Sequence, residues 1–301
     1  MVEDPGWPRA SDWLAGNLEP GTRTRRLAVV GVPLSQTSIS ASGANETPAA
    51  IRTALRRFPT YGAALDVNLE ELEVIDHGDL DVAALSGEAA ISAVREGLLC
   101  LPPADLVVLL GGDNAITRPA MRALLPPLGR CALVTLDAHH DVRGFHAGAT
   151  NGTPVRGLIE DGLPGKHVVQ VGIADWSNSL AYRGYCEQHG IGLVSVRDAS
   201  REGTGACVRR VLDELATWCE AIYVDLDVDV VDSAFAPGCP GARPGGLTPG
   251  ELLDAAREAG RHPLVRAVDI VEVDAARDRT GATVDLAAMC LLSVAEGLVI
   301  R

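Results

Sequence analysis

The segment LVTLDAHHDVR, residues 133–143, decides both the expected fold and the expected site. Its first half is a short apolar run rich in β-branched residues, which is typical of a buried strand. Its second half places Asp137, His139 and Asp141 where that strand should end. Ligands of α/β proteins bind at the carboxyl ends of the strands. The segment therefore predicts a sheet with polar side chains at its ligand-binding edge.

Asp137, His139 and Asp141 alternate along the chain, so in an extended segment they point to the same side. Two carboxylates and an imidazole that converge suit a hard or borderline divalent metal ion. For this segment alone, the alternative interpretation is a solvated loop that happens to be acidic.

Two further strand ends favour the metal site. The buried-strand pattern at 221–224 runs into DLDVDVVD, residues 225–232, where Asp225, Asp227 and Asp229 would share one face of an extended chain. A row of carboxylates repels itself unless positive charge lies among them, and metal ions supply that charge. The sequence GGDN, residues 111–114, follows the apolar run at 106–110 in the same position.

The order of the expected elements predicts the fold class. Strands alternate with helices of about 10–15 residues, which predicts a three-layer α/β/α fold with a central, mostly parallel sheet of about eight strands. We expect residues 1–26 to form an N-terminal arm and residues 27–301 a single domain. The expected strands are residues 27–32, 72–76, 106–110, 133–137, 168–172, 191–196, 221–227 and 264–271.

Composition limits the function classes. A net charge of −14 argues against nucleic acid and anionic membranes as partners, because both require basic surfaces. The seven cysteines are an odd number without a CxxC pair, as expected for reduced cytosolic thiols. The N-terminus lacks the apolar core of a signal peptide, and the apolar stretch at 286–300 is too short to span a bilayer. We expect a soluble cytoplasmic protein with a small-molecule substrate.

Five segments occur in an order that resembles the ureohydrolase family of arginases, agmatinases and formiminoglutamases. They are GGDNAIT (111–117), DAHHDVR (137–143), NGTPVRG (151–157), DLDVDVVDSAFAPG (225–238) followed by PGGLT (244–248), and VDIVEVD (268–274). The resemblance covers the chain from Leu27 to the C-terminus. It implies an arginase-like fold and a homo-oligomer, either a trimer or a hexamer.

The resemblance also implies two manganese ions that share a hydroxide, which attacks an amidine or guanidine carbon. Such a pair of metals lowers the pKa of the bridging water and polarises the substrate. Five of the six usual ligand positions are matched by Asp137, His139, Asp141, Asp227 and Asp229.

Two positions depart from the family pattern. The sixth ligand is usually a histidine, and here it is Asn114, whose carboxamide oxygen is a neutral and weaker ligand. The hypothesis is that one of up to two Mn²⁺ ions per chain is loosely held. Zinc, nickel or iron also suit these ligand types, although the oxygen-rich set favours manganese. The second departure is Asn151, at the position of a histidine that is thought to shuttle protons.

Because asparagine cannot transfer protons, such a role would pass from Asn151 to His140, to His146 or to bulk water. The alternative for His140 is an ordinary loop histidine. Glu272 matches the family glutamate that holds the cationic substrate through a planar two-point contact. Its alternative is a buried strand-end carboxylate that the backbone satisfies. The catalytic candidates are therefore Glu272, His140 and Asn151.

The substrate branch is indicated by DAHHDVR, NGTP and the sequence WSNS at 176–179, which resemble the formiminoglutamases. That branch hydrolyses N-formimino-L-glutamate to glutamate and formamide, so its site must hold two carboxylates. Arg143 and Arg243 are the cationic candidates, beside Asn151 and Glu272, because arginine suits bidentate carboxylate binding. For either arginine, the alternative is a solvated surface position or an intersubunit salt bridge.

Two other functions are kept as alternatives. The first is an agmatinase-like or guanidino-acid ureohydrolase, which would release urea instead of formamide. The second is a metal-poor, non-catalytic homologue, which the loss of two family histidines would suit. Metal content and turnover separate this homologue from the enzymes, and the released product separates the two enzymes.

Overall fold

The computed structural model describes residue 4, residues 6–18 and residues 25–301, so the expected N-terminal arm lies partly outside the described residues. Within the described part of that arm, Ala10–Leu14 forms the short helix α1. The Trp13 side chain is buried and packs into the hydrophobic core. This end of the chain is therefore attached to the body of the protein.

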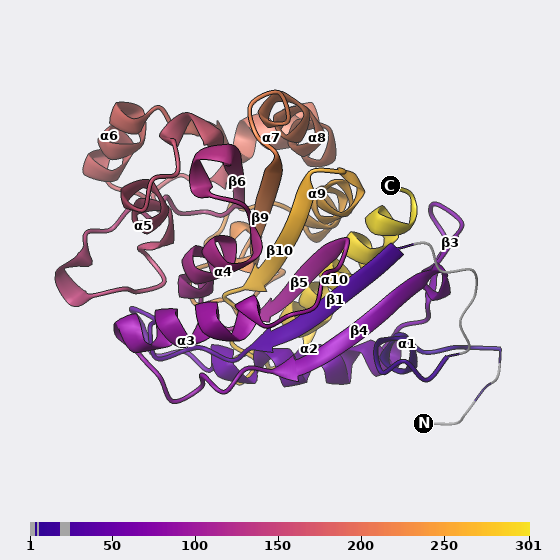
Figure 1. The fold of residues 1–301 in the computed structure, drawn as a ribbon. Helices are drawn as coiled ribbons and strands as arrows, with labels where there is room; N and C mark the ends of the chain where they lie inside the picture. The colour runs from indigo at the N-terminus through magenta and orange to yellow at the C-terminus, as the bar shows by residue number, and fades with distance from the viewer. Residues whose placement is uncertain (1–3, 5, 19–24) are drawn as a thin grey trace.

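An eight-stranded sheet crosses the protein in the order β4-β1-β5-β10-β9-β6-β7-β8, and neighbouring strands pair in parallel (Figure 1). The expected parallel sheet is thus confirmed. Its strands are β1 (Arg25–Val32), β4 (Leu72–Asp79), β5 (Leu106–Gly111), β6 (Cys131–Leu136), β7 (Val168–Ile173), β8 (Gly192–Ser195), β9 (Ala221–Asp227) and β10 (Val265–Val271).

Helices cover both faces of the sheet, because successive strand residues point to opposite faces and both sets are apolar. Leu27 and Val29 contribute to one core, and Ala28 and Val30 to the other. The first core is closed by α1, α2 (Thr47–Ala54), α7 (Val196–Glu202), α8 (Thr204–Leu215), α9 (Pro249–Arg261) and α10 (Ala282–Val299). The second is closed by α3 (Gly87–Leu99), α4 (Thr117–Leu124), α5 (Pro154–Glu160) and α6 (Leu180–His189).

The structure corrects the expectation that the acidic rows lie in extended chain. β6 ends at Leu136, and residues 228–230 form a 3-10 turn, so neither row simply alternates along a strand. The cause is local, because Asp137 accepts a hydrogen bond from the His139 N–H at 2.6 Å and Asp227 accepts one from the Asp229 N–H at 2.8 Å. Aspartates that bond the backbone two residues ahead favour turns over strands.

The C-terminal helix α10 is 18 residues long and apolar enough to cross a membrane by length and composition. Seventy-two per cent of it is buried within the protein, where its buried side chains join those of α9 in one core. Its hydrophobicity is therefore explained by its place in the core. The sequence patterns did not predict α7 or the small antiparallel pair of β2 (Tyr61–Gly62) and β3 (Val67–Asn68).

Candidate metal and substrate site

The four central strands β5, β10, β9 and β6 are neighbours in the sheet, and each delivers a polar residue at its carboxyl end. Several of the polar residues at this edge line a cavity of about 190 Å³. Its lining comprises Ser38, Ile39, Ser40, Ser42, His139, Asp141, Arg143, Asn151, Gly152, Ser177, Asn178, Tyr182, Asp227, Asp229, Pro240, Gly241, Arg243 and Glu272. The carboxyl edge of the sheet therefore holds the site, as expected for a parallel α/β sheet.

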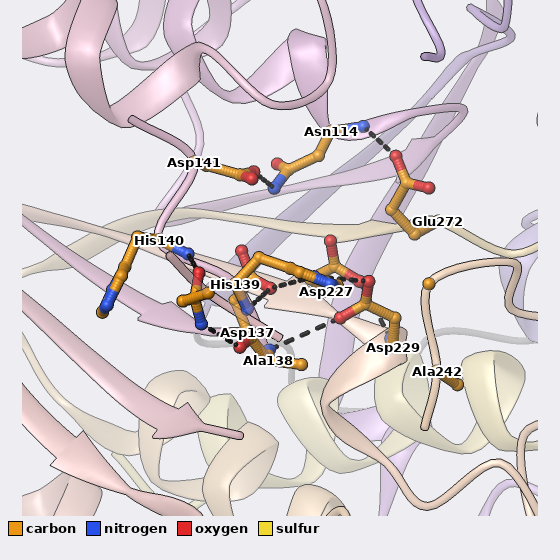
Figure 2. Close-up of polar contacts among 12 residues, drawn as sticks. Asn114, Asp137, Ala138, His139, His140, Asp141, Asp227, Asp229, Ala242 and Glu272 are labelled. Atoms are coloured by element: carbon orange, nitrogen blue, oxygen red, sulfur yellow. Dashed lines mark hydrogen bonds and ion pairs between the residues drawn. The ribbon is translucent and has the colours of Figure 1, made fainter. Parts of the chain in front are cut away.

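Asp137, His139 and Asp229 form the centre of this site (Figure 2). The His139 Nδ1 lies 3.0 Å from Asp229 Oδ2 and 3.4 Å from Asp137 Oδ1. One ligand atom from each of the three residues lies within 4.8 Å of the others, which is close enough to hold one metal ion. Asp227, at the end of β9, lines the same cavity and is 2% exposed.

Burial and mutual repulsion shape the electrostatics of this cluster. Burial, followed by the charge of Asp229, raises the pKa of Asp137 to about 6. Burial and Asp229 likewise raise the pKa of Asp227 well above its ordinary value. Burial alone would lower the pKa of His139, but Asp229 and Asp137 outweigh it and raise that pKa to about 12. These raised pKa values mean that the cluster favours the uptake of positive charge, either as protons or as a bound cation.

Asp141 extends the cluster towards the end of β5. Its backbone has a φ of 51°, a left-handed conformation that is uncommon outside glycine and is often found at functional sites. Its Oδ2 accepts a hydrogen bond of 2.7 Å from Asn114 Nδ2. Burial and the charge of Asp137 raise the pKa of Asp141 well above its ordinary value. The structure therefore brings all six predicted metal ligands into one neighbourhood.

The donor set fits a divalent metal ion. Oδ2 of Asp137 is buried and has no hydrogen-bond partner among the described residues, which is costly unless something positive binds it. Carboxylate oxygens dominate, with one imidazole and one carboxamide, a combination that suits manganese. Asn114, Asp137, His139, Asp141, Asp227 and Asp229 are the residues that would hold metal.

Glu272 follows β10 and reaches the same cavity. Its Oε1 accepts hydrogen bonds from the Asn114 N–H at 2.8 Å and from Asn151 Nδ2 at 3.0 Å. No described residue hydrogen-bonds Oε2, so this oxygen remains for a ligand. Burial and the nearby Asp113 raise the pKa of Glu272 to about 8. Its φ of 65° is a strained backbone conformation, as at Asp141.

The sequence pattern of the arginase family matches residues 25–296. The chain belongs to the arginase family. It is 37% identical over 286 residues to a formimidoylglutamase of Halalkalibacterium halodurans, with coverage of 93% of this chain and 90% of that protein.

Other relatives support the same arginase-family assignment. The crystal structure of formimidoylglutamase from Bacillus subtilis matches with a TM-score of 0.91 and 33% identity, covering 100% of this chain and 95% of that one. Proclavaminate amidinohydrolase from Streptomyces clavuligerus is 30% identical over 276 residues, with coverage of 89% and 87%. The resemblance that the sequence segments indicated is confirmed.

Asn151, where the arginase-family pattern led us to expect a histidine, ties three parts of the site together. Its side-chain Oδ1 accepts a hydrogen bond of 3.0 Å from the Ile39 N–H, and its own N–H donates to the Thr37 carbonyl at 3.1 Å. Its Nδ2 donates to Glu272. The asparagine therefore connects the loop before α2 to the glutamate.

The structure does not bring His140 into the metal cluster. The ring is buried and turns away from the cluster (Figure 2). Its Nδ1 lies 2.7 Å from Gln170 Oε1. Burial lowers the pKa of His140, so the ring favours its neutral form. His146 is exposed in the loop after β6 and does not line the cavity.

Arg143 and Arg243 both line the cavity and both are exposed. The Arg143 guanidinium lies 5.9 Å from the centre of the Tyr182 ring. Arg243 donates from Nη1 to the backbone carbonyls of residues 240–242 at 2.9–3.2 Å. Neither arginine forms an ion pair with any described residue. The structure thus places two unneutralised cations beside the acidic cluster.

Sequence reasoning missed Tyr182 and the serines at the cavity mouth as individual residues. Ser38, Ser40 and Ser42, which line the cavity, come from the long loop at 33–46. Tyr182 lies near the start of α6, shortly after the cavity-lining Ser177 and Asn178. No local signal marks it, because its place at the cavity depends on tertiary packing.

Proposed function

We propose that this chain hydrolyses N-formimino-L-glutamate to glutamate and formamide with bound manganese. The observation that carries the proposal is the pair of arginines, Arg143 and Arg243, which line the same cavity as the metal-binding cluster and lack acidic partners among the described residues. The planar guanidinium of arginine binds a carboxylate through two parallel hydrogen bonds. A substrate with two carboxylates and an amidine matches this arrangement. Two relatives of this chain are formimidoylglutamases, which supports the same substrate.

The residues of this chain would divide the work as follows. Glu272 Oε2 would accept an N–H of the formimino group, and a cationic ligand there favours the ionised carboxylate. Asn151 and the Asn114 N–H hold that carboxylate in place through Oε1. Bound manganese would lower the pKa of water and polarise the formimino carbon. Water oxygen joins that carbon, the C–N bond to glutamate breaks, and a proton passes to the leaving amine.

The decisive experiment is an assay of the manganese-loaded protein against N-formimino-L-glutamate, agmatine, arginine and guanidinobutyrate, with metal counted on the same sample. We expect turnover of N-formimino-L-glutamate with release of formamide. Release of urea from a guanidine would instead favour an agmatinase-like or guanidino-acid ureohydrolase. No turnover of any of the four with metal bound would overturn both.

Arg143→Gln and Arg243→Gln should each raise KM for N-formimino-L-glutamate roughly 10- to 100-fold, because each removes a charge-assisted hydrogen bond. Arg197→Gln, an exposed arginine on α7, serves as the control and should leave KM unchanged. Steady-state kinetics with purified variants measures the effect. If both site variants keep the wild-type KM, the arginines do not bind substrate and are solvated surface residues or form intersubunit salt bridges.

Asn114→His should tighten the weaker of the two metal sites, because imidazole binds manganese more strongly than a carboxamide oxygen does. A manganese titration that reports free ion, compared with wild type, measures the change. An unchanged titration would refute the view that Asn114 weakens one site.

We also infer up to two manganese ions per chain, one of them loosely held.

The runner-up is a guanidino-acid or agmatinase-like ureohydrolase. The observation in its favour is the 30% identity to proclavaminate amidinohydrolase and to a human guanidino acid hydrolase.

We further infer a single catalytic domain over residues 27–301, a homo-oligomeric assembly of three or six chains, and a cytoplasmic location. These inferences rest on the family resemblance and the composition, and sedimentation analysis would test the assembly.

A further inference from the structure

The side chain of Asn114 has a second partner behind the metal cluster. Its Nδ2 points to Asp141 (Figure 2). Its Oδ1 lies 2.7 Å from the hydroxyl of Thr117, the first residue of α4. Thr117 is fully buried. A carboxamide can turn over in the same space, because its oxygen and its amino group are similar in size but opposite in hydrogen-bonding character. Thr117 therefore influences which end of Asn114 faces the cluster.

The Thr117 hydroxyl also lies 2.7 Å from Asp269 Oδ2, on β10. The same carboxylate oxygen accepts a hydrogen bond of 2.8 Å from the Tyr223 hydroxyl. Thr117 has one proton, yet both Asn114 Oδ1 and Asp269 Oδ2 are acceptors. While the Asn114 oxygen faces Thr117, one of these two buried oxygens receives no proton from it. Asp269 Oδ2 keeps the Tyr223 proton in either case, but two acceptor oxygens at 2.7 Å with no proton between them repel each other.

The conflict disappears when the Asn114 carboxamide is turned over. Nδ2 then donates to the Thr117 oxygen, and the Thr117 proton goes to Asp269, so each contact joins one donor and one acceptor. In this orientation the Asn114 oxygen faces Asp141 Oδ2, which now receives a hydrogen bond at 2.7 Å. Two oxygens at that separation repel each other unless a cation lies between them. The orientation that satisfies Thr117 is the one that presents a metal ligand.

We propose that Thr117, itself oriented by Asp269, is a positioning residue that holds the Asn114 carboxamide with its oxygen towards the metal. Metal binding and the turn of Asn114 are then one coupled event. The proposal rests on the metal role of Asn114 proposed above. Thr117 itself would touch neither metal nor substrate, and its hydroxyl proton would point towards Asp269.

Thr117→Val keeps the shape of the side chain and removes the hydroxyl. It should weaken manganese binding at the Asn114 site about 10- to 100-fold, as loss of a partner behind a metal ligand typically does. Thr117→Ser retains the hydroxyl and should restore binding. The measurement is a manganese titration by electron paramagnetic resonance of the free ion, with thermal unfolding of chelator-treated protein to confirm folding. Thr117→Ala provides a second variant if valine prevents folding.

Tyr223→Phe is the matched control, because it removes a buried hydroxyl from the same Asp269 oxygen and leaves Thr117 its acceptor. It should bind manganese as wild type does. In an Asn114→Ala background, Thr117→Val should have no further effect. Equal loss in the threonine and tyrosine variants, or no loss in Thr117→Val, would overturn the inference. If Asn114→Ala also binds like wild type, Asn114 is no ligand and the proposed metal set fails as well.

Discussion

Asp227→Ala is expected to abolish metal binding and activity together while leaving the protein folded. The Asp227 carboxylate is buried and lines the cavity, and it accepts a hydrogen bond from the Asp229 N–H. It is one of the residues that would hold metal. A bound metal contributes several kcal/mol to catalysis, so the loss of activity should be on the order of 10³-fold or more. Metal counting and the formimino-glutamate assay on one preparation measure both effects.

The expected stability of this variant distinguishes a metal ligand from a structural residue. Asp137, Asp229 and Glu272 each help to raise the pKa of Asp227 by repelling its charge. Removing this carboxylate should therefore leave the chelator-treated protein as stable as wild type or more stable, but without the increase in Tm that manganese causes. Asp213→Ala, at an exposed position, is the control. Full activity with unchanged metal content would refute the assignment.

The central strands of the sheet could be predicted from sequence because each is an apolar run followed by polar residues. Leu106–Gly111 and Cys131–Leu136 lie within two residues of the expected bounds, since buried parallel strands have this simple signature. The metal residues could be predicted because they follow those strands directly. The left-handed backbone at Asp141 and Glu272 could not, because it depends on contacts around the residue and not on its type.

Contacts between distant segments were the other limit. The role of Asn151 depends on Thr37, Ile39 and Glu272, which come from separate loops. Asp269 was visible in the sequence as an ionisable residue inside an apolar strand. Its link to Thr117 requires that β10 lie beside β5, although many elements separate them along the chain. Periodicity indicates which residues are buried, but the order of strands decides which of them meet.

Removal of the metal should make the stability of the protein fall as pH rises from about 5 to 8. Burial raises the pKa of Asp137 to about 6 and that of Glu272 to about 8, above their values in an unfolded chain. In that window the folded state therefore binds more protons than the unfolded state, and stability decreases with pH. His139, with its pKa raised to about 12, acts in the same direction above its ordinary pKa.

Manganese replaces these protons, so its stabilising effect should grow with pH by several kcal/mol between about pH 5 and pH 8. Thermal unfolding of chelator-treated and manganese-loaded protein across this range measures the difference. Glu272→Gln is the matched variant: without the group whose pKa is about 8, the chelator-treated protein should lose less stability between pH 6 and 8. In this view, protons or metal ions offset the repulsion among the buried carboxyls that dominate the site. A chelator-treated protein that becomes more stable towards pH 8 would contradict it.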